Sequence, residues 1–228
     1  MKTKVVVFDW DGVLCNSAEI YVQHFNTVLA HYGKEPVTLW EFRESAKTTN
    51  KEFFLQYAIK NTEEATRRFI ALTRKEPRPN LFPDVHDTLR WLSHRGIETR
   101  VVSGHPKKDI ERVLKLYGLD GMITNVKGGV SVPDKIQSLA DVIIEKGITA
   151  DELVFVDDMD EILKLAREIG CYVVGSARGF CSYTRLANAE PDKIMHNLKG
   201  LEGFINWIHH IYEQRHMVYP VHTRRSGK

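Results

Sequence analysis

The amino-acid sequence predicts an α/β fold in which a parallel sheet carries helices on both faces and a small all-helical segment is inserted after the first strand. Short apolar runs end in Asp, Ser or Gly and precede amphipathic helical patterns, an alternation typical of parallel sheets. The stretch over residues 17–75 breaks that alternation, because it contains helical patterns and no convincing strand.

The expected elements follow from these runs and from the residues that end them. The strands are predicted at Lys4–Phe8, Glu98–Val102, Gly121–Asn125, Leu153–Val156 and Cys171–Val174. Helical spacing of apolar residues marks Asp84–Arg95, Lys107–Tyr117, Ile136–Lys146 and Met159–Ile169. A glycine follows each of these helices, as a left-handed C-terminal position favours: Gly96, Gly118, Gly147 and Gly170. The regular order predicts a Rossmann-like sheet.

The inserted segment is expected to form helices over Ile20–Tyr32, Leu39–Ser45, Glu52–Lys60 and Glu63–Thr73. Pro77 and Pro79 predict an extended return to the sheet, since proline lacks an amide donor and restricts the residue before it. We place the boundary near Leu81, so that residues 1–15 and 82–228 form the α/β core and residues 16–81 the insertion. A surface tail is predicted from His216 onward.

Composition excludes several classes of protein. The 228 residues are 43% hydrophobic and 27% charged, which excludes a disordered chain. Lys and Arg total 32 against 30 Asp and Glu, and this balance does not favour a nucleic-acid or membrane partner. The first apolar run stops at Asp9, so we expect no signal peptide and a cytoplasmic protein. Three cysteines without CxxC spacing argue against a disulfide framework and a zinc site.

Two pairs of acids follow two of the predicted strands. Asp9 and Asp11 are two residues apart, and an extended backbone would direct both toward the edge where open α/β sheets bind ligands. Their mutual repulsion would be relieved by a divalent cation or by a shared proton. Asp157 and Asp158 follow another apolar run and are expected at the same opening. The acids therefore predict a metal site or an acid/base couple.

Small residues at the same edge suit a ligand that approaches the backbone. Gly12 permits a tight turn beside the acids. Ser103 ends a predicted strand, and Gly104 opens a turn before the helix that starts at Lys107. The Ser103 hydroxyl and nearby amides can hold a phosphate at the positive end of that helix, although an ordinary helix-capping serine is the alternative.

Four segments in order resemble the motifs of the haloacid dehalogenase (HAD) superfamily. Motif I is similar to "VVVFDWDGVLCNS", motif II to "VVSGH" and motif IV to "VFVDDMDE", with Lys135 at the motif III position. The segment Leu81–Ile97 is similar to the part that re-enters the core in phosphoglycolate-phosphatase-like members. The resemblance covers the core, and the helical insertion corresponds in position and type to the cap of these enzymes.

The resemblance implies a role for each matched residue. Asp9 would be the nucleophile that forms an aspartyl-phosphate, and Asp11 the general acid and base. Ser103 would contact the phosphate, and Lys135 would neutralise its oxygens, with Lys127 as a rival for the lysine. Dehalogenases of the superfamily lack the second acid, so its presence favours phosphoryl transfer.

A Mg²⁺ cofactor is implied in the same way. The Asp9 carboxylate, the Asp11 backbone carbonyl and the Asp158 carboxylate would bind the ion, with Asp157 as a ligand or a supporting group. Asp160 and Glu161 receive no assignment, because Asp160 can simply favour a helix N-terminus.

The cap is where substrate recognition is expected. Arg43 and Lys47, near Asn50 and Lys51, can contact the far end of a substrate, although such a cluster is more often a solvated helix face. We therefore expect a Mg²⁺-dependent phosphatase acting on a small phosphorylated metabolite such as phosphoglycolate, a nucleotide or a sugar phosphate. A sugar phosphomutase of the β-phosphoglucomutase type, a phosphonate hydrolase using a cap lysine and a non-catalytic HAD-fold module are the alternatives. Oligomeric state is left open.

Overall fold

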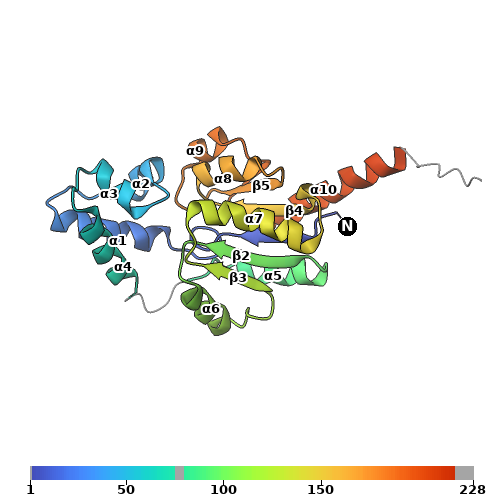
Figure 1. Cartoon of the computed structure of the whole chain (residues 1–228), viewed down its shortest axis with the longest axis horizontal. Helices are drawn as coiled ribbons and strands as arrows, with labels where there is room; N and C mark the ends of the chain where they lie inside the picture. The colour runs from blue at the N-terminus through green and yellow to red at the C-terminus, as the bar shows by residue number, and fades with distance from the viewer. Residues whose placement is uncertain (1, 75–79, 219–228) are drawn as a thin grey trace, which may run out of the picture.

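A six-stranded parallel sheet forms the centre of the protein in a computed structural model that describes residues 2–74 and 80–218 (Figure 1). The strand order is β3-β2-β1-β4-β5-β6. The strands are β1 (Val5–Phe8), β2 (Glu98–Ser103), β3 (Asn125–Gly128), β4 (Leu153–Asp157), β5 (Tyr172–Ser176) and β6 (Lys193–Met195). Phe8 of β1 is in register with Val156 of β4, so the chain segments that follow these two strands leave the sheet side by side.

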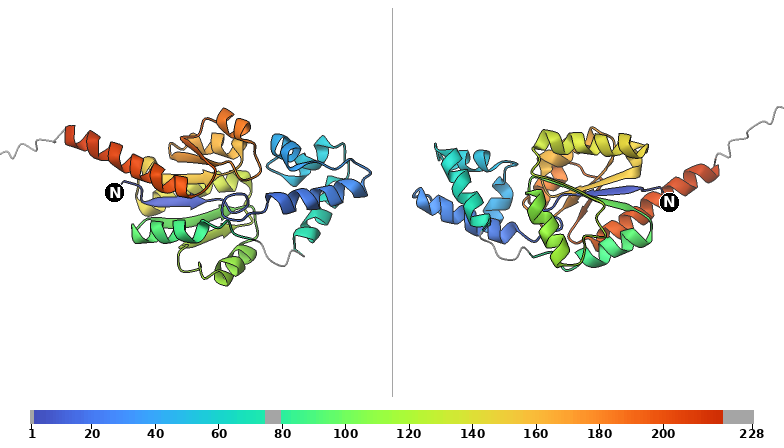
Figure 2. Two further views of the ribbon diagram at one scale, coloured as in Figure 1. Left: turned by 180° about the vertical axis from the view of Figure 1, so that it is seen from behind. Right: turned by 60° about the horizontal axis from the view of Figure 1, so that its bottom comes forward.

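Helices cover both faces of the sheet, which confirms the predicted fold class (Figure 2). They are α5 (Val85–His94), α6 (Lys107–Leu116), α7 (Val132–Lys146), α8 (Asp160–Arg167), α9 (Tyr183–Asn188) and α10 (Lys199–Val218), with a short 3₁₀ turn at Ala150–Glu152. The strands are buried on both sides: in β1, Val7 packs toward α7 and α8, whereas Val6 packs toward α5, α6 and α10. Within the described residues, no helix combines the length and the apolar character that a bilayer crossing requires.

The helical insertion after β1 is also confirmed, with α1 (Ala18–His31), α2 (Leu39–Ser45), α3 (Asn50–Gln56) and α4 (Thr62–Thr73). Its core is aromatic, because the ring of Phe25 lies 4.2 Å from Phe69 and 4.0 Å from Phe53 between centroids. These rings belong to one apolar cluster with buried residues of α7 and α8, so the insertion packs against the sheet layer.

Two antiparallel connections join the insertion to the sheet. Asn16 N donates to Asn80 O at 2.7 Å, and Phe82 N donates to Leu14 O at 3.0 Å. The predicted boundaries between the core and the insertion, at residues 15/16 and 81/82, fall within these paired connections. The division into two domains remains a prediction. The prediction for Pro77 and Pro79 lies outside the described residues.

Several boundaries differ from the sequence predictions. The third strand was expected at Gly121–Asn125 but spans Asn125–Gly128; it is exposed or half-buried and lies at a sheet edge, so it lacks the apolar run that marked the others. The three-residue edge strand β6 was missed for the same reason, and the six-residue α9 was missed because it is too short to show helical periodicity. Helix α10 continues through Val218, so the predicted start of a tail at His216 is wrong.

The start of α7 was also placed too late. The helix begins at Val132 rather than Ile136, because Ser131 Oγ accepts a hydrogen bond from Asp134 N at 3.4 Å and a proline occupies the first turn. Polar and proline residues in the first turn of a helix interrupt its apolar periodicity. The capping residues therefore indicate the start of α7 better than the periodicity does.

Candidate active site

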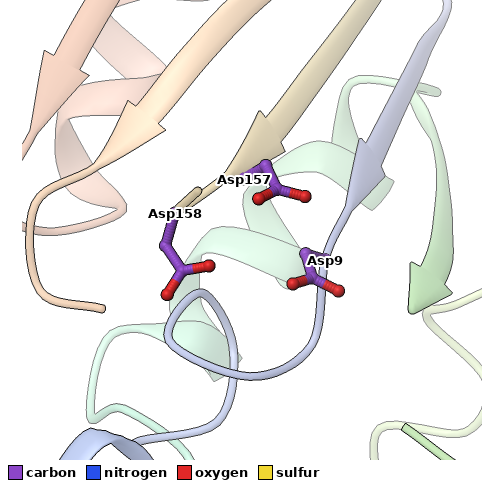
Figure 3. A group of neighbouring side chains, drawn as sticks. All are labelled: Asp9, Asp157 and Asp158. Carbon is purple, nitrogen blue, oxygen red and sulfur yellow. The ribbon is translucent and has the colours of Figure 1, made fainter. Parts of the chain in front are cut away.

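Three buried carboxylates meet at the carboxyl edge of the sheet (Figure 3). Asp9 follows β1, and Asp157 and Asp158 come from the end of the neighbouring strand β4. One oxygen of each acid lies within 4.8 Å of the others, and the residues are 6%, 0% and 1% exposed. The sequence prediction that the two strand ends bring their acids to one opening is thus met by the structure.

Lys135 reaches the same cluster from α7. Its Nζ donates to Asp157 Oδ2 at 2.9 Å and lies 3.0 Å from Asp9 Oδ1. Its rival Lys127 lies on the edge strand β3, half exposed, with its Nζ 3.6 Å from Asp141 Oδ2. The structure therefore brings Lys135 to the acids and leaves Lys127 away from them.

Burial and repulsion raise the pKa of two of these carboxyls, Asp9 and Asp158. Burial raises the pKa of Asp9 to about 6, with Lys135 opposing the rise and the charges of Asp157 and Asp11 adding to it. For Asp158, burial followed by the charges of Asp157 and Asp9 holds the pKa well above its ordinary value. Burial alone would lower the pKa of Lys135, but Asp157 and Asp9 outweigh it and keep the ammonium charged.

The donor set fits a hard divalent cation. Three carboxylates face one ammonium, which leaves an excess of buried negative charge. Asp9 Oδ1 is buried and accepts no well-aligned hydrogen bond from the described residues. Clustered carboxylate oxygens with spare acceptor capacity are the ligands that Mg²⁺ and Ca²⁺ prefer.

Asp11 lies beside this group but not within it. Its Oδ2 accepts hydrogen bonds from Tyr21 OH at 3.1 Å and from His105 Nδ1 at 3.0 Å. Burial would lower the pKa of His105, but the bond to Asp11 and its charge outweigh that effect and raise it. Asp11 Oδ1 is buried and accepts no hydrogen bond from the described residues. One oxygen is thus held by two donors, while the other has no hydrogen-bond partner among the described residues.

The sequence did not assign Tyr21 or His105 to this site. His105 was within reach, since it stands in the quoted segment "VVSGH" two residues after Ser103. Tyr21 belongs to α1 of the insertion, and no pattern in the sequence marks it as a partner of Asp11.

Ser103 and Gly104 lie at the end of β2, the neighbour of β1 on the other side. Ser103 is buried, and its Oγ accepts a hydrogen bond from His105 N at 3.2 Å. Gly104 is exposed, and helix α6 starts at Lys107 without a side-chain cap on its first amides. Serine hydroxyls and uncapped amides at a helix start are groups that can donate hydrogen bonds to a phosphate.

Gly12 cannot be replaced by a larger residue without disturbing the acids. Its φ is +68°, and a Cβ atom there would lie 2.0 Å from Asp158 Oδ2 and 2.7 Å from Gly179 Cα. Ser176 Oγ also donates to Gly12 O at 2.9 Å, which fixes the turn. The tight turn predicted at Gly12 lets the chain after β1 pass directly against Asp158.

The cap residues predicted to bind substrate are placed differently from each other. The Arg43 guanidinium donates to the core, with Nε 2.9 Å from Gly179 O and Nη2 3.0 Å from Arg178 O. Lys47 is exposed in the segment between α2 and α3. Asp160, left without an assignment, forms an ion pair with Arg185, and Glu161 accepts a hydrogen bond from Thr48 of the cap at 3.3 Å.

Comparison with known proteins agrees with this geometry. Residues 6–176 match the family described as haloacid dehalogenase-like hydrolase. The chain belongs to this family. It is therefore a HAD-type hydrolase, and the resemblance seen in its four motifs is confirmed.

Curated relatives and solved structures extend the likeness to nearly the whole chain. A phosphoglycolate phosphatase of Synechococcus elongatus is 22% identical over 84% of this chain and 92% of its own, and one of Pasteurella multocida is 26% identical over 83% and 92%. The structure of a predicted phosphoglycolate phosphatase from Haemophilus somnus, 20% identical, superposes with a TM-score of 0.76 over 90% of this chain and 99% of that one. A protein of Bacteroides vulgatus proposed to be a beta-phosphoglucomutase, 16% identical, has a TM-score of 0.70 over 91% and 89%. At these identities the structural likeness concerns the fold.

Proposed function

We propose that the protein is a Mg²⁺-dependent phosphatase that hydrolyses a small phosphomonoester through an aspartyl-phosphate on Asp9. The observation that carries the proposal is the group of three buried carboxylates beside the Lys135 ammonium at the edge of the sheet. In this proposal residues 1–15 and 82–228 are the catalytic core, and residues 16–81 are a cap that covers the site and contacts the substrate.

The chain's own residues divide hydrolysis into two displacements. Asp9 attacks phosphorus, and the alcohol leaves with a proton from Asp11; water then attacks the aspartyl-phosphate and gives its proton to Asp11, releasing phosphate. Ser103 and Lys135 hold the phosphate oxygens during both steps. Bound Mg²⁺, with Asp9, Asp158, Asp157 and the Asp11 carbonyl as its proposed ligands, supplies positive charge next to the transferring phosphoryl group.

Contacts between the cap and the core support a small substrate. Tyr21 and Arg43 of the cap contact the core beside the acids, and Asp9 is 6% exposed, so we expect a compact substrate to reach Asp9 more readily than a polymer. Phosphoglycolate is the first compound to test, because it is the substrate in the names of the curated relatives. Exposed Lys47 is the cap cation proposed to contact the substrate.

A phosphatase screen over phosphoglycolate, nucleotides and sugar phosphates, with and without Mg²⁺, tests the function. Asp9→Asn keeps the shape of the side chain but removes the nucleophile, so we expect release of inorganic phosphate to fall about a thousandfold or more. The exposed Asp87→Asn on α5 is the control and should behave like wild type. Full activity of Asp9→Asn would contradict the mechanism.

The products separate the remaining alternatives. An isomerised sugar phosphate in place of inorganic phosphate would identify a phosphomutase. Binding of Mg²⁺ without turnover of any compound would identify a non-catalytic module.

A further inference from the structure

The loop that joins β5 to α9, residues 177–182, contacts one acid of the proposed metal site. Phe180 N donates to Asp158 Oδ2 at 2.6 Å. A Cβ atom on Gly179 would lie 2.0 Å from the same oxygen, so the loop backbone packs directly against this carboxylate. A small movement of the loop therefore moves Asp158 or breaks its hydrogen bond.

The other side of this loop is held by the cap. Arg43 Nε donates to Gly179 O at 2.9 Å, and Arg43 Nη2 donates to Arg178 O at 3.0 Å. The Gly179 carbonyl and the Phe180 amide belong to one planar peptide group. Arg43 thus binds the oxygen of the peptide whose N–H binds Asp158, and a charged donor on the oxygen strengthens the N–H as a donor.

Further contacts fix the position of Arg43 itself. Its backbone oxygen accepts hydrogen bonds from Ser182 N and from Arg185 Nη1, each at 3.2 Å, and the same Arg185 atom donates to Ala46 O at 2.9 Å. Arg185 is in turn paired with Asp160 at 2.6 Å. The C-terminal end of α2 therefore rests against the core, on the side where α8 and α9 lie (Figure 1).

We propose that Arg43 is a positioning residue for the metal site rather than the substrate contact that the sequence suggested. With the cap against the core, its guanidinium orients the Gly179–Phe180 peptide, and that peptide orients the Asp158 carboxylate toward the cation. The inference rests on the proposed function, because it takes Asp158 as a Mg²⁺ ligand. It makes the affinity for the metal depend on a side chain of the cap.

Titration of the full-length protein with Mg²⁺ alone, followed by calorimetry, tests this role without turnover. Residues that orient a metal ligand typically change metal affinity tenfold or more, so Arg43→Met should weaken Mg²⁺ binding about tenfold. Arg67→Met is the matched control, since Arg67 is an exposed arginine of the cap helix α4, and it should bind Mg²⁺ like wild type. In kinetics, the half-saturating Mg²⁺ concentration should rise for Arg43→Met, while KM for the phosphoester at saturating Mg²⁺ stays near wild type.

The outcomes separate this inference from the proposed function. Wild-type Mg²⁺ affinity in Arg43→Met, or a raised KM with unchanged Mg²⁺ affinity, overturns the positioning role and leaves the phosphatase proposal standing. A wild-type protein that binds no Mg²⁺ overturns both. Should Arg43→Met fail to fold, Arg43→Gln, which can donate to one carbonyl at a time, provides the same test with the same expected direction.

Discussion

Lys135 is the residue on which the charge balance of the site depends. It is 4% exposed and contacts Asp9 and Asp157, while Asp158 adds a third buried acid nearby. The same ammonium therefore stabilises the folded protein and, in the proposed mechanism, the negative oxygens of the phosphoryl group.

Replacement of Lys135 by Met should cost stability as well as activity. Removing one partner of a buried ion pair leaves uncompensated charge, and we expect about 3–5 kcal/mol lower free energy of unfolding in metal-free buffer. Urea unfolding measures this loss, and added Mg²⁺ should restore part of it. Lys127→Met, which breaks an exposed pair with Asp141, is the control and should change stability by less than about 1 kcal/mol. An equal loss of unfolding free energy in the two variants would contradict the claim that Lys135 compensates the buried charge of the acids.

At the scale of elements, strand β2 is tied to α7 by an ion-pair network outside the site. The guanidinium of Arg100, on β2, donates to Glu98 Oε1 at 2.7 Å and to both oxygens of Glu145 on α7, at 2.8 and 2.6 Å. Burial opposes ionisation of Glu98, but hydrogen bonds from Lys146 and Arg100 hold its pKa below the ordinary 4.5. A hydrogen bond from Arg100 lowers the pKa of Glu145 as well.

This network predicts a loss of stability in acid. A carboxyl whose pKa is lowered by folding stabilises the protein above its unfolded pKa, and that contribution disappears as the pH falls through the folded value. Arg100→Met should therefore lower the free energy of unfolding near neutral pH by about 1–3 kcal/mol and reduce its decline below about pH 4.5. Denaturant unfolding at several pH values measures both effects. Arg112→Met, at an exposed pair with Asp109, should leave the pH dependence unchanged.

For the whole molecule, the site lies where the sheet meets the helical insertion, whose buried apolar residues form one continuous cluster with the sheet face that α7 and α8 cover. The sheet supplies the acids at its edge, and the cap supplies Tyr21 to Asp11 and Arg43 to the loop behind Asp158. The acids repel one another when no cation is present, so the folded protein carries an electrostatic cost at its centre that bound metal would relieve.

Mg²⁺ should therefore raise the melting temperature. A ligand that binds the folded state alone stabilises it by about 2.7 kcal/mol at a concentration one hundred times its Kd. Asp158→Asn removes one of the repelling charges, so the variant should melt at or above the wild-type temperature without metal and respond little to Mg²⁺. Differential scanning calorimetry with and without chelator measures both. A full Mg²⁺-dependent rise in Asp158→Asn would exclude Asp158 as a ligand.

Much of the fold was predictable because its signals are local. Runs such as the one ending at Phe8 are buried on both sides of a parallel sheet and stay apolar throughout, which makes them visible in the sequence. Edge strands β3 and β6 have one partner and an exposed side, and their mixed composition concealed them. The start of α7 was also misplaced, because it is set by the capping side chain of Ser131 and not by apolar periodicity.

The sequence by itself determined the alternation of strands and helices, the all-helical insertion, and acids at the ends of two strands that had to meet if those strands were neighbours. Only the tertiary structure decided that Lys135 rather than Lys127 reaches the acids, that Tyr21 and His105 hold Asp11, and that Arg43 binds the loop behind Asp158. The physical reason is the distance along the sequence over which each interaction acts. Apolar periodicity and capping act between residues a few positions apart, whereas these contacts join segments up to 136 positions apart and exist only once the layers have packed.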